Sequence, residues 1–478
     1  MGNYYTLSVK PSCLWTDETL IDKRIDAHFY SIKYMQYYNK LMKCELKKMS
    51  LYNICSRMNS GPFGSALLAS QYVDKGIPFI RPLNCKDYIV DVDEDVVFIS
   101  KEDSERLKSS RFSSEDLIFT KIGNGIGDVA IIPQKIFKCN ISGNLMGVTV
   151  KNNMDNYYVL TFLKSIYGQN QIWQGMMNSA KPKIDMDTLK SILIPIPSPK
   201  IQKYIGDKVR KAEELREEAK RLKKEAEEIL NDELKLSYFN ERVKDAPKMY
   251  NWIYGESIEV RIDSQYYINE TNFINNEMYK KGLKLKRISE IANVGKGFSY
   301  TSLDNKSIPY IRISDLDDLL INFDSVELVD EKTYSEKKSS QLEQYDLIFA
   351  ITGATIGKVS LFYNSKCSKA TLSSDTAFAR LKDKNDAAYV LLYLKSFIGQ
   401  LGILKGVTGA TNRHLSLEHI GDIFIPVIDN KLKQEINMRV IKAIDNVYLS
   451  KQLIKEAKQD VEDLIEGNFD MSKVKANS

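Results

Sequence analysis

The sequence predicts an α+β fold in which two pseudo-symmetric globular domains are separated by a pair of long antiparallel coiled-coil helices. Three observations predict this fold: the chain length, an internal repeat and two heptad patterns. The 478 residues are 43% hydrophobic, which suffices for two to four domains with apolar cores. The repeat indicates that the two domains are copies of one unit, and the heptad patterns predict a long helix after each copy.

The internal repeat keeps its order over nearly half of the chain. The matching segments are 23–26 with 260–263, 77–81 with 308–312, 116–119 with 346–349, Gly123, Ile126 and Gly127 with Gly353, Ile356 and Gly357, 158–160 with 389–391, and Ile194, Pro195 and Gln202 with Ile425, Pro426 and Gln434. After the first pair, the partners lie 230 to 232 residues apart. A tandem duplication explains this nearly constant spacing, and chance does not.

Each copy combines strand and helix patterns. Apolar runs bounded by Gly, Asn and Ser predict strands at 96–99, 117–121, 129–132, 347–351 and 359–362. Apolar residues at i, i+3 and i+4 predict one helix over Tyr157–Ile166 and another over Ala388–Phe397. Strands and helices in this mixture indicate an α+β domain.

Two further segments carry apolar residues at seven-residue spacing among charged residues. We predict that the helices contact each other through Ile205, Ala212, Leu215, Ala219, Leu222, Ala226 and Ile229 in the first segment and Val440, Val447, Ile454, Ala457, Val461 and Leu464 in the second. Because each helix follows its own domain, a paired arrangement runs antiparallel. The charged runs 208–210 and 220–224 then lie on the solvated face, with contact to a partner subunit as the alternative.

Composition argues against several classes of protein. The net charge of +5 is too small to indicate nucleic-acid binding by itself. Six scattered cysteines without a C-x-x-C pair predict a reduced, cytoplasmic protein, and three histidines far from any thiol pair argue against a zinc site. The polar N-terminus lacks a signal-peptide core, and no run of 18 apolar residues predicts a membrane helix.

The order of domain, long helix, related domain and long helix resembles the specificity subunit of type I DNA restriction-modification systems. Four short sequence motifs show the same resemblance: Gly-Pro-Phe-Gly-Ser at 61–65, Gly-Ile-Pro-Phe-Ile-Arg at 76–81, Asp-Leu-Ile-Phe at 116–119 and Ile-Pro-Ile-Pro at 194–197. The resemblance runs from about Lys23 to Gly467. It implies target-recognition domains at 1–197 and 239–428, spacer helices at 198–238 and 429–468, and a C-terminal tail at 469–478.

The same resemblance implies that each domain reads one half of an interrupted double-stranded DNA target. This chain would be non-catalytic and hold no cofactor or metal. Two modification subunits would supply S-adenosylmethionine and the adenine-methylating site, and two restriction subunits would use ATP and Mg. The residues agree, because the chain has no Pro-Pro dipeptide for a flipped-base pocket, and the loop 353–358 fits a tight turn better than a phosphate loop.

Base edges in the major groove are read by Arg, Lys, Asn, Gln, Ser and Thr, so polar residues beside glycines are the DNA-binding candidates. In the first domain these are Ser60, Ser65, Arg81, Asn84, Lys121, Asn124, Asn140, Ser142, Asn144, Ser179, Lys181 and Lys183. In the second they are Lys296, Ser299, Tyr300, Thr301, Arg312, Ser314, Thr352, Thr355, Lys369, Ser373, Ser374, Thr408, Thr411, Asn412 and Arg413. The two sets differ in chemistry at equivalent positions, as two unlike half-sites require.

Several candidates also have structural interpretations. An ion pair or strand cap explains Arg81 and Arg312 as well as DNA contact does, and a scaffold role is favoured for Arg24 and Arg261. Gly61, Gly64, Gly295 and Gly297 fit either ordinary turns or close approach of the backbone to phosphate. His414 and His419 fit surface or packing positions better than catalytic bases.

Three rival functions stay open from the sequence. The chain could be a nuclease or methyltransferase in its own right, which the missing Pro-Pro word and cofactor loop argue against. It could be a coiled-coil scaffold whose globular domains bind protein or RNA. It could also be the specificity subunit of a system that only methylates DNA. Binding to duplex DNA, with and without the modification subunit, separates the scaffold from the DNA readers.

Overall fold

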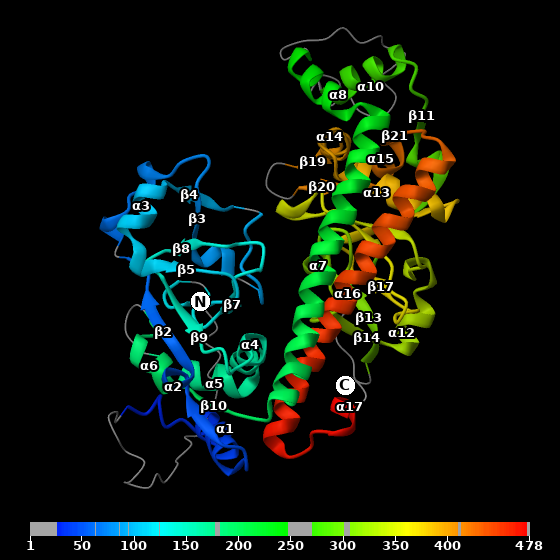
Figure 1. The fold of residues 1–478 in the computed structure, drawn as a ribbon. Helices are drawn as coiled ribbons and strands as arrows, with labels where there is room; N and C mark the ends of the chain where they lie inside the picture. The colour runs from blue at the N-terminus through cyan, green and yellow to red at the C-terminus, as the bar shows by residue number, and fades with distance from the viewer. Residues whose placement is uncertain are drawn as a thin grey trace, which may run out of the picture. The chain divides into compact units, whose positions relative to one another are not determined.

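The computed structural model describes residues 26–62, 64–85, 87–93, 95–123, 125–176, 182–246, 270–300, 306–409 and 413–475. The chain divides into two compact units, and many of their elements are labelled in Figure 1. Unit 1 consists of Met1–Glu214 with Leu449–Ser478, and unit 2 consists of Leu215–Tyr448. Each unit therefore combines one globular region with one half of each long helix.

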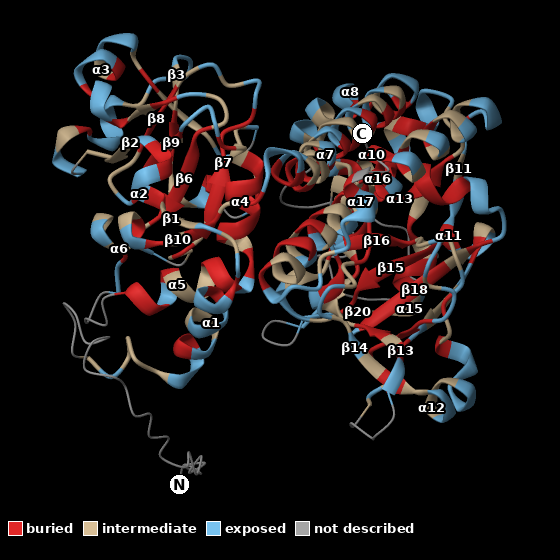
Figure 2. Ribbon diagram, turned by 60° about the horizontal axis from the view of Figure 1, so that its bottom comes forward, coloured by how far each residue is buried: buried red, intermediate tan, exposed pale blue. Residues whose placement is uncertain are grey.

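Unit 1 is built on a four-stranded antiparallel sheet of order β2-β9-β6-β7. Its strands are β2 (Cys55–Ser60), β9 (Leu145–Val150), β6 (Leu117–Thr120) and β7 (Val129–Ile131). A second sheet of order β4-β3-β8-β5 contains β4 (Val97–Ile99), β3 (Ile77–Ile80), β8 (Cys139–Ile141) and β5 (Arg111–Phe112), and β1 (Lys48–Ser50) pairs with β10 (Leu193–Pro195). The strands β6 to β9 are buried almost throughout, as Figure 2 shows in red.

Unit 2 repeats this plan. Its four-stranded sheet, β12-β18-β15-β16, contains β12 (Ala292–Lys296), β18 (Thr376–Leu381), β15 (Asp346–Ala350) and β16 (Val359–Phe362). The second sheet, β14-β13-β17, contains β14 (Glu327–Asp330), β13 (Lys306–Ile311) and β17 (Thr371–Leu372), while β11 (Leu285–Arg287) pairs with β21 (Phe424–Pro426) and β19 (Val407–Thr408) with β20 (His414–Leu415).

The two units also share their strand register. Leu117 lies opposite Val148 in unit 1, and Leu347 lies opposite Ala379 in unit 2. Each second sheet contains one parallel pair, formed by β3 with β8 and by β13 with β17. The structure therefore confirms the predicted duplication, and the five predicted strands occur within one residue of their predicted ends.

Two successive helices follow each four-stranded sheet along the chain. The helices predicted over Tyr157–Ile166 and Ala388–Phe397 are confirmed as α4 (Asn156–Lys164) and α13 (Ala387–Lys395), whereas α5 (Ile166–Gly175) and α14 (Phe397–Lys405) were not predicted; in unit 2 the two helices bend by 84°. The break between α4 and α5 has a local cause, because the Ser165 hydroxyl accepts a hydrogen bond from the Gly168 N–H and caps the second helix. A Cβ on Gly168 would lie 2.3 Å from the Phe162 carbonyl oxygen, so the tight bend requires glycine.

Shorter helices complete both units. They are α1 (Ile32–Lys43), α2 (Leu51–Ile54), α3 (Lys101–Arg106), α6 (Met186–Ser191) and α17 (Ser472–Lys475) in unit 1, and α8 (Leu236–Arg242), α10 (Glu270–Lys280), α11 (Ile288–Ile291), α12 (Glu331–Glu336) and α15 (Leu417–Asp422) in unit 2. Helix α1 packs against α5, with the Tyr37 and Tyr167 rings edge to face at 5.6 Å.

The two long helices are α7 (Pro199–Leu234), of 36 residues, and α16 (Asn430–Glu466), of 37 residues. In unit 1, the predicted contact residues Ile205, Ala212, Ile454, Ala457 and Val461 are buried in one apolar cluster with the globular core. Leu464 packs at the edge of that cluster, and its side chain is only half-buried. The first half of α7 therefore packs against the second half of α16.

In unit 2, the remaining halves of these helices pack together. Ala219 and Leu222 cluster with Ala443 and with half-buried Val447, and Leu215 is buried. Ala226 and Val440 enter the core of the globular region. In both units the paired positions run in opposite directions along the two helices, as predicted.

The heptad prediction was wrong at the helix ends. Ile229 is only half-buried, whereas Leu230 and Leu234 are almost fully buried, and Ile465 is buried in place of Leu464. A straight α-helix drifts by about 20° per heptad relative to a strict seven-residue repeat. The apolar face therefore moves by one position over four heptads.

The predicted solvated charge runs are also partly buried. Lys208 has a side chain that is 15% exposed and pairs with Asp460, which is 2% exposed. In unit 2 the Nε of Arg439, which matches Lys208 in the repeat, lies 3.3 Å from Glu225 Oε2, and Lys442 Nζ lies 2.7 Å from Glu218 Oε1. Ion pairs therefore join α7 and α16 in both units.

The start of each long helix is anchored to its globular region. The Gln202 side chain accepts a hydrogen bond from the Asp155 N–H at 3.1 Å and donates to the Pro197 carbonyl at 3.0 Å. In unit 2 the corresponding anchor is Lys433, whose Nζ lies 2.8 Å from Asp386 Oδ1. Gln202 was paired with Gln434 in the repeat, which is wrong by one residue. Gln434 is exposed, and the structural equivalent of Gln202 is Lys433.

Candidate nucleic-acid interface

Four chain segments meet at one end of the four-stranded sheet in unit 1. The Gly61 N–H donates to the Leu145 carbonyl at 3.0 Å, and the Lys121 N–H donates to the Asn144 carbonyl at 2.9 Å. The Ile184 N–H donates to the Lys121 carbonyl at 3.1 Å. We call residues 60–61, 121, 142–145 and 183–184 the first sheet-end surface.

Three predicted DNA-binding side chains gather on this surface. Asn144 and Lys183 are exposed, and Lys121 is half-buried between them. Burial lowers the pKa of the Lys121 ammonium, and the nearby charge of Lys183 lowers it further. Two ammonium groups that repel each other attract a shared anion, and the neighbouring Asn144 amide can both donate and accept hydrogen bonds.

Unit 2 forms the same arrangement with different side chains. The Gly297 N–H donates to the Thr376 carbonyl at 3.1 Å, the Ile351 N–H to the Asp375 carbonyl at 3.0 Å, and the Leu415 N–H to the Ile351 carbonyl at 2.9 Å. These three backbone hydrogen bonds repeat those of unit 1 position by position. We call residues 296–297, 351–352, 373–376 and 413–415 the second sheet-end surface.

The second sheet-end surface contains residues that the sequence reasoning missed. Asp375 is exposed at the position of Asn144, and His414, which was assigned to surface or packing, is exposed at the position of Lys183. The Thr352 hydroxyl donates to Asp375 Oδ1 at 3.0 Å. The constant offset between the copies could have identified Asp375, but a search restricted to cationic, amide and hydroxyl residues passes over a carboxylate.

Three candidates are corrected because their side chains are buried. Asn140 is fully buried in β8, where it donates to the Leu107 carbonyl and Ser110 Oγ and accepts from Ser104 Oγ at 2.7 Å. Asn84 is 1% exposed and accepts from the Arg81 N–H, and Ser373 is 5% exposed. These side chains hold the backbone of the domain and cannot reach a base.

The two arginines that follow the Ile-Pro word have structural partners. Arg81 Nη2 donates to the Asp95 carbonyl at 2.6 Å, and Arg312 forms ion pairs with Glu327 and Asp315. The strand-cap and ion-pair interpretation therefore accounts for both residues.

The remaining candidates are spread over several segments. Ser60 ends β2. The exposed candidates are Ser65, Lys296, Ser299, Ser314, Thr408 and Arg413, and the half-buried ones are Ser142, Thr352, Thr355 and Ser374. Tyr300 packs against the Tyr310 ring at 5.7 Å, and Lys369 pairs with Glu331. Asn124, Ser179, Lys181, Thr301, Thr411 and Asn412, together with Arg24 and Arg261, lie outside the described residues.

The glycines of the repeated words now have separate explanations. A Cβ on Gly61 would lie 1.9 Å from the Ser142 carbonyl oxygen, and one on Gly297 would lie 2.1 Å from that of Ser373. Gly295 faces the Phe378 ring, whereas Gly64 has nothing within 4 Å. Close packing of backbone on backbone therefore requires glycine at Gly61 and Gly297.

The glycine-containing loops that follow β6 in unit 1 and β15 in unit 2 are both turns. Gly123 and Gly127 have φ of 113° and 88°, and Gly353 and Gly357 have φ of 75° and 109°. These left-handed conformations connect antiparallel strands, which explains the glycines without a bound phosphate. Among the described residues, no group of three or more His, Cys, Asp or Glu side chains could hold a metal ion.

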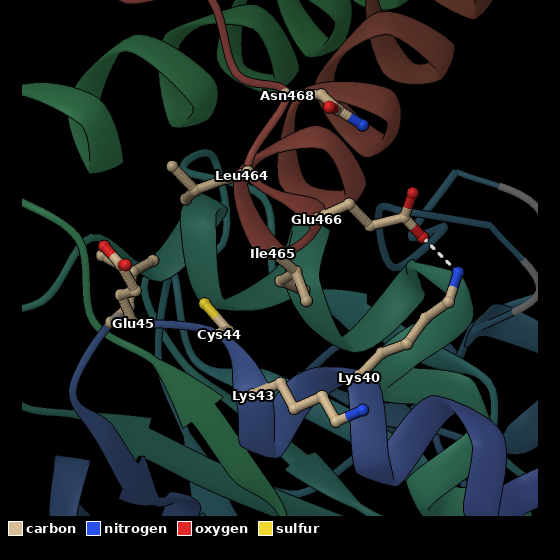
Figure 3. A pocket seen from close by; sticks show the side chains of 10 residues that line it. Lys40, Lys43, Cys44, Glu45, Leu464, Ile465, Glu466 and Asn468 are labelled. Carbon is tan, nitrogen blue, oxygen red and sulfur yellow. Dashed lines mark hydrogen bonds and ion pairs between the residues drawn. The ribbon is translucent and has the colours of Figure 1, made fainter.

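A pocket of about 580 Å³ lies in unit 1, away from the sheet-end surface, between the ends of α1 and α16 (Figure 3). Lys40 and Glu466 form an ion pair at 2.9 Å on its wall, and Tyr167 donates to the same carboxylate at 2.6 Å. These contacts lower the pKa of Glu466, with the Tyr167 hydrogen bond as the largest cause. The pocket wall thus fixes the end of α16 to the globular region.

The described part of the chain includes no single helix with both the length and the apolar character needed to cross a bilayer. Within the same described residues, Lys384–Lys395 and Phe397–Lys405 taken together meet that test, and they are sharply bent. Helix α13 is buried in the core of unit 2.

Comparison with known proteins gives consistent results. The model of the type I restriction modification DNA specificity domain matches residues 45–228 and again residues 280–459. The type I restriction enzyme MjaIX specificity subunit of Methanocaldococcus jannaschii is 22% identical over 397 residues, which span 80% of this chain and 84% of that protein.

Two solved structures align with most of the chain. The type I restriction-modification S subunit of M. genitalium has a TM-score of 0.47 and 13% identity, covering 90% of this chain and 97% of its own. The HsdS subunit of Thermoanaerobacter tengcongensis has a TM-score of 0.29 and 13% identity, covering 88% and 97%. Because the family model matches twice and spans more than half of the residues, this chain belongs to the family of type I restriction-modification DNA specificity proteins, with two specificity domains in tandem.

Proposed function

We propose that this chain is the non-catalytic subunit that reads an interrupted, two-part duplex DNA target for a type I restriction-modification complex. The observation that carries the proposal is the pair of sheet-end surfaces, which share three backbone hydrogen bonds and differ in their side chains. The same backbone arrangement with different side chains is suited to two domains that recognise two different half-sites.

The chemistry of the first sheet-end surface favours DNA over an apolar partner. Lys121 and Lys183 supply positive charge for phosphates, and Asn144 supplies an amide that matches the N6 and N7 edge of adenine. The second surface presents Asp375, His414 and Arg413 instead. Its lower positive charge fits a reader that depends more on base contacts and on partner subunits for affinity.

The long helices suit two further roles. Helices of 36 and 37 residues that pack on each other in each unit can fix the gap between the half-sites. They also offer a platform for two modification subunits and two restriction subunits. In this proposal S-adenosylmethionine, ATP and Mg belong to those partners, and the complex works in the cytoplasm, where the DNA is.

Footprinting with the assembled complex tests the proposal. The chain with its modification subunit should protect two short segments of a target duplex on either side of an unread gap. Replacing Lys121 and Lys183 with Ala should weaken binding to all sequences and reduce the slope of log K against log salt by about 1 to 2. The exposed pair Lys211 and Glu214 supplies the matched control, Lys211→Ala, which should leave the slope unchanged.

Specific results would overturn the proposal. One continuous footprint would contradict the two-part target. Absence of duplex-specific binding even in the complex would favour a protein or RNA scaffold. Methylation of DNA by the purified chain alone with S-adenosylmethionine would show that it is an enzyme in its own right.

A further inference from the structure

The two sheet-end surfaces differ most sharply at one turn. In unit 1 this turn follows β8 and places Asn144 one residue before β9; in unit 2 it follows β17 and places Asp375 one residue before β18. The carbonyls of both residues accept the equivalent hydrogen bond, from Lys121 at 2.9 Å and from Ile351 at 3.0 Å. Both side chains are exposed. The backbone therefore presents an amide in one unit and a carboxylate in the other from the same place.

An exposed carboxylate at a DNA interface has few favourable partners. Phosphates repel it, so it gains binding energy only from hydrogen-bond donors on the base edges. Cytosine presents its N4 amino group in the major groove, which a carboxylate can accept. Adenine presents a donor beside the N7 acceptor, so its edge matches an amide, which has one group of each kind, and repels a second carboxylate oxygen.

A neighbouring hydroxyl orients the Asp375 carboxylate so that it can accept a hydrogen bond from one donor group of a ligand. The Thr352 hydroxyl donates to Oδ1 at 3.0 Å and orients the carboxylate, while Oδ2 stays available to accept from a ligand. Thr352 lies opposite His414 in an isolated bridge of the second sheet-end surface. The carboxylate thus points from a fixed part of this surface and not from a free loop.

We infer that Asp375 and Asn144 are specificity-determining residues at equivalent positions: Asp375 reads a cytosine through its N4 amino group, and Asn144 reads an adenine. This inference rests on the proposed DNA-reading function and adds base identities to it. Thr352 acts as a positioning residue, because it holds the carboxylate and does not itself contact the base.

Selection from a pool of randomised duplexes by the complete complex, with its modification subunits, tests this assignment. Asp375→Asn should change one position of one half-site from cytosine to adenine, with a shift in preference of roughly 5- to 150-fold. Asn144→Asp should make the reverse change in the other half-site. Thr352→Val should keep the cytosine but reduce the discrimination at that same position.

The matched control is Asp383→Asn. Asp383 is also exposed and follows the other end of β18, and Asn replaces its capping role on the Asn385 N–H. This variant should select the unchanged motif. All four substituted residues are exposed or half-buried in their own units, and thermal melting of each variant checks that it folds.

The outcomes separate this inference from the proposed function. If the Asp375→Asn complex selects an unchanged motif, or binds every sequence equally more tightly, Asp375 does not read a base and the inference fails. If the unaltered complex selects no motif at all, the proposed DNA-reading function fails first. A motif with two half-sites that each respond to one variant supports both.

Discussion

Lys208 on α7 donates a hydrogen bond to the buried carboxylate of Asp460 on α16, 252 residues further along the chain. Burial opposes the charge on Lys208, but its hydrogen bonds to Asp460 and Tyr204 outweigh this effect and raise the pKa of the ammonium. The ion pair of Arg439 with Glu225 joins the same two helices in unit 2, where both side chains are partly exposed. Such a contact fixes the register of two helices.

Lys208→Ala should destabilise the protein by about 2 kcal/mol, because it leaves the Asp460 carboxylate buried with Lys473 as its remaining ion-pair partner. Replacing both residues, as Lys208→Met with Asp460→Leu, should restore most of the loss, since apolar side chains need no partner. Urea unfolding measures both effects. Lys211→Ala, at an exposed pair, should change stability by less than about 0.5 kcal/mol, and an equal loss in this control would contradict the role of burial.

Gly61→Ala should destabilise unit 1 by about 2 kcal/mol, and Gly297→Ala should do the same in unit 2, because each Cβ would collide with a backbone carbonyl. Gly64→Ala provides the control within the same five-residue word, since its Cβ meets open space. Thermal melting of the three variants compares them directly. Equal melting temperatures for Gly61→Ala and Gly64→Ala would show that the turn can relax.

Asn140 and Asn144 should separate stability from DNA reading. Asn140→Ala removes three buried hydrogen bonds and should cost about 2 to 3 kcal/mol. Asn144→Ala removes an exposed amide and should leave stability within about 0.5 kcal/mol while it weakens sequence-specific binding. Parallel measurements of unfolding and duplex binding test the contrast, and loss of stability in Asn144→Ala would contradict its exposed position.

Lys405 should make stability depend on pH. Burial lowers its pKa to about 8, below the value of about 10.4 in unfolded chains. Between these values the unfolded state binds more protons, so stability should rise with pH from 8 to 10.4. Lys405→Gln, which places the residue found at Gln174 in unit 1, should raise stability at pH 7 by about 1 kcal/mol. The advantage should disappear above pH 10.4, and a constant advantage at every pH would be the contrary result.

The fold followed from the sequence where patterns repeat. Apolar runs predicted five of the strands, i, i+3, i+4 spacing predicted α4 and α13, and seven-residue spacing predicted both long helices, because burial imposes these patterns on the sequence. The details that failed depend on three-dimensional contacts. Ser165 begins a new helix by capping α5, and the apolar face of α7 drifts from Ile229 to Leu230 because seven residues fall short of two full turns at 3.6 residues per turn.

The candidate site was predicted in part. Lys121, Asn144 and Lys183 were chosen from separate segments, and the structure brings them together. Asn140 was chosen for the same polar character but is buried, since composition alone does not separate a strand-internal amide from a loop amide. Asp375 was passed over because the candidates were limited to cationic, amide and hydroxyl residues, although its equivalence to Asn144 was visible in the repeat.

The central claim is that two copies of one reader recognise two unlike half-sites separated by a fixed gap. Sequencing the methylated bases in cells that carry this chain with its modification subunit tests the claim directly. The account predicts one motif with two different half-sites and a constant number of unread base pairs between them. A single uninterrupted motif, or a gap that varies from site to site, would contradict it.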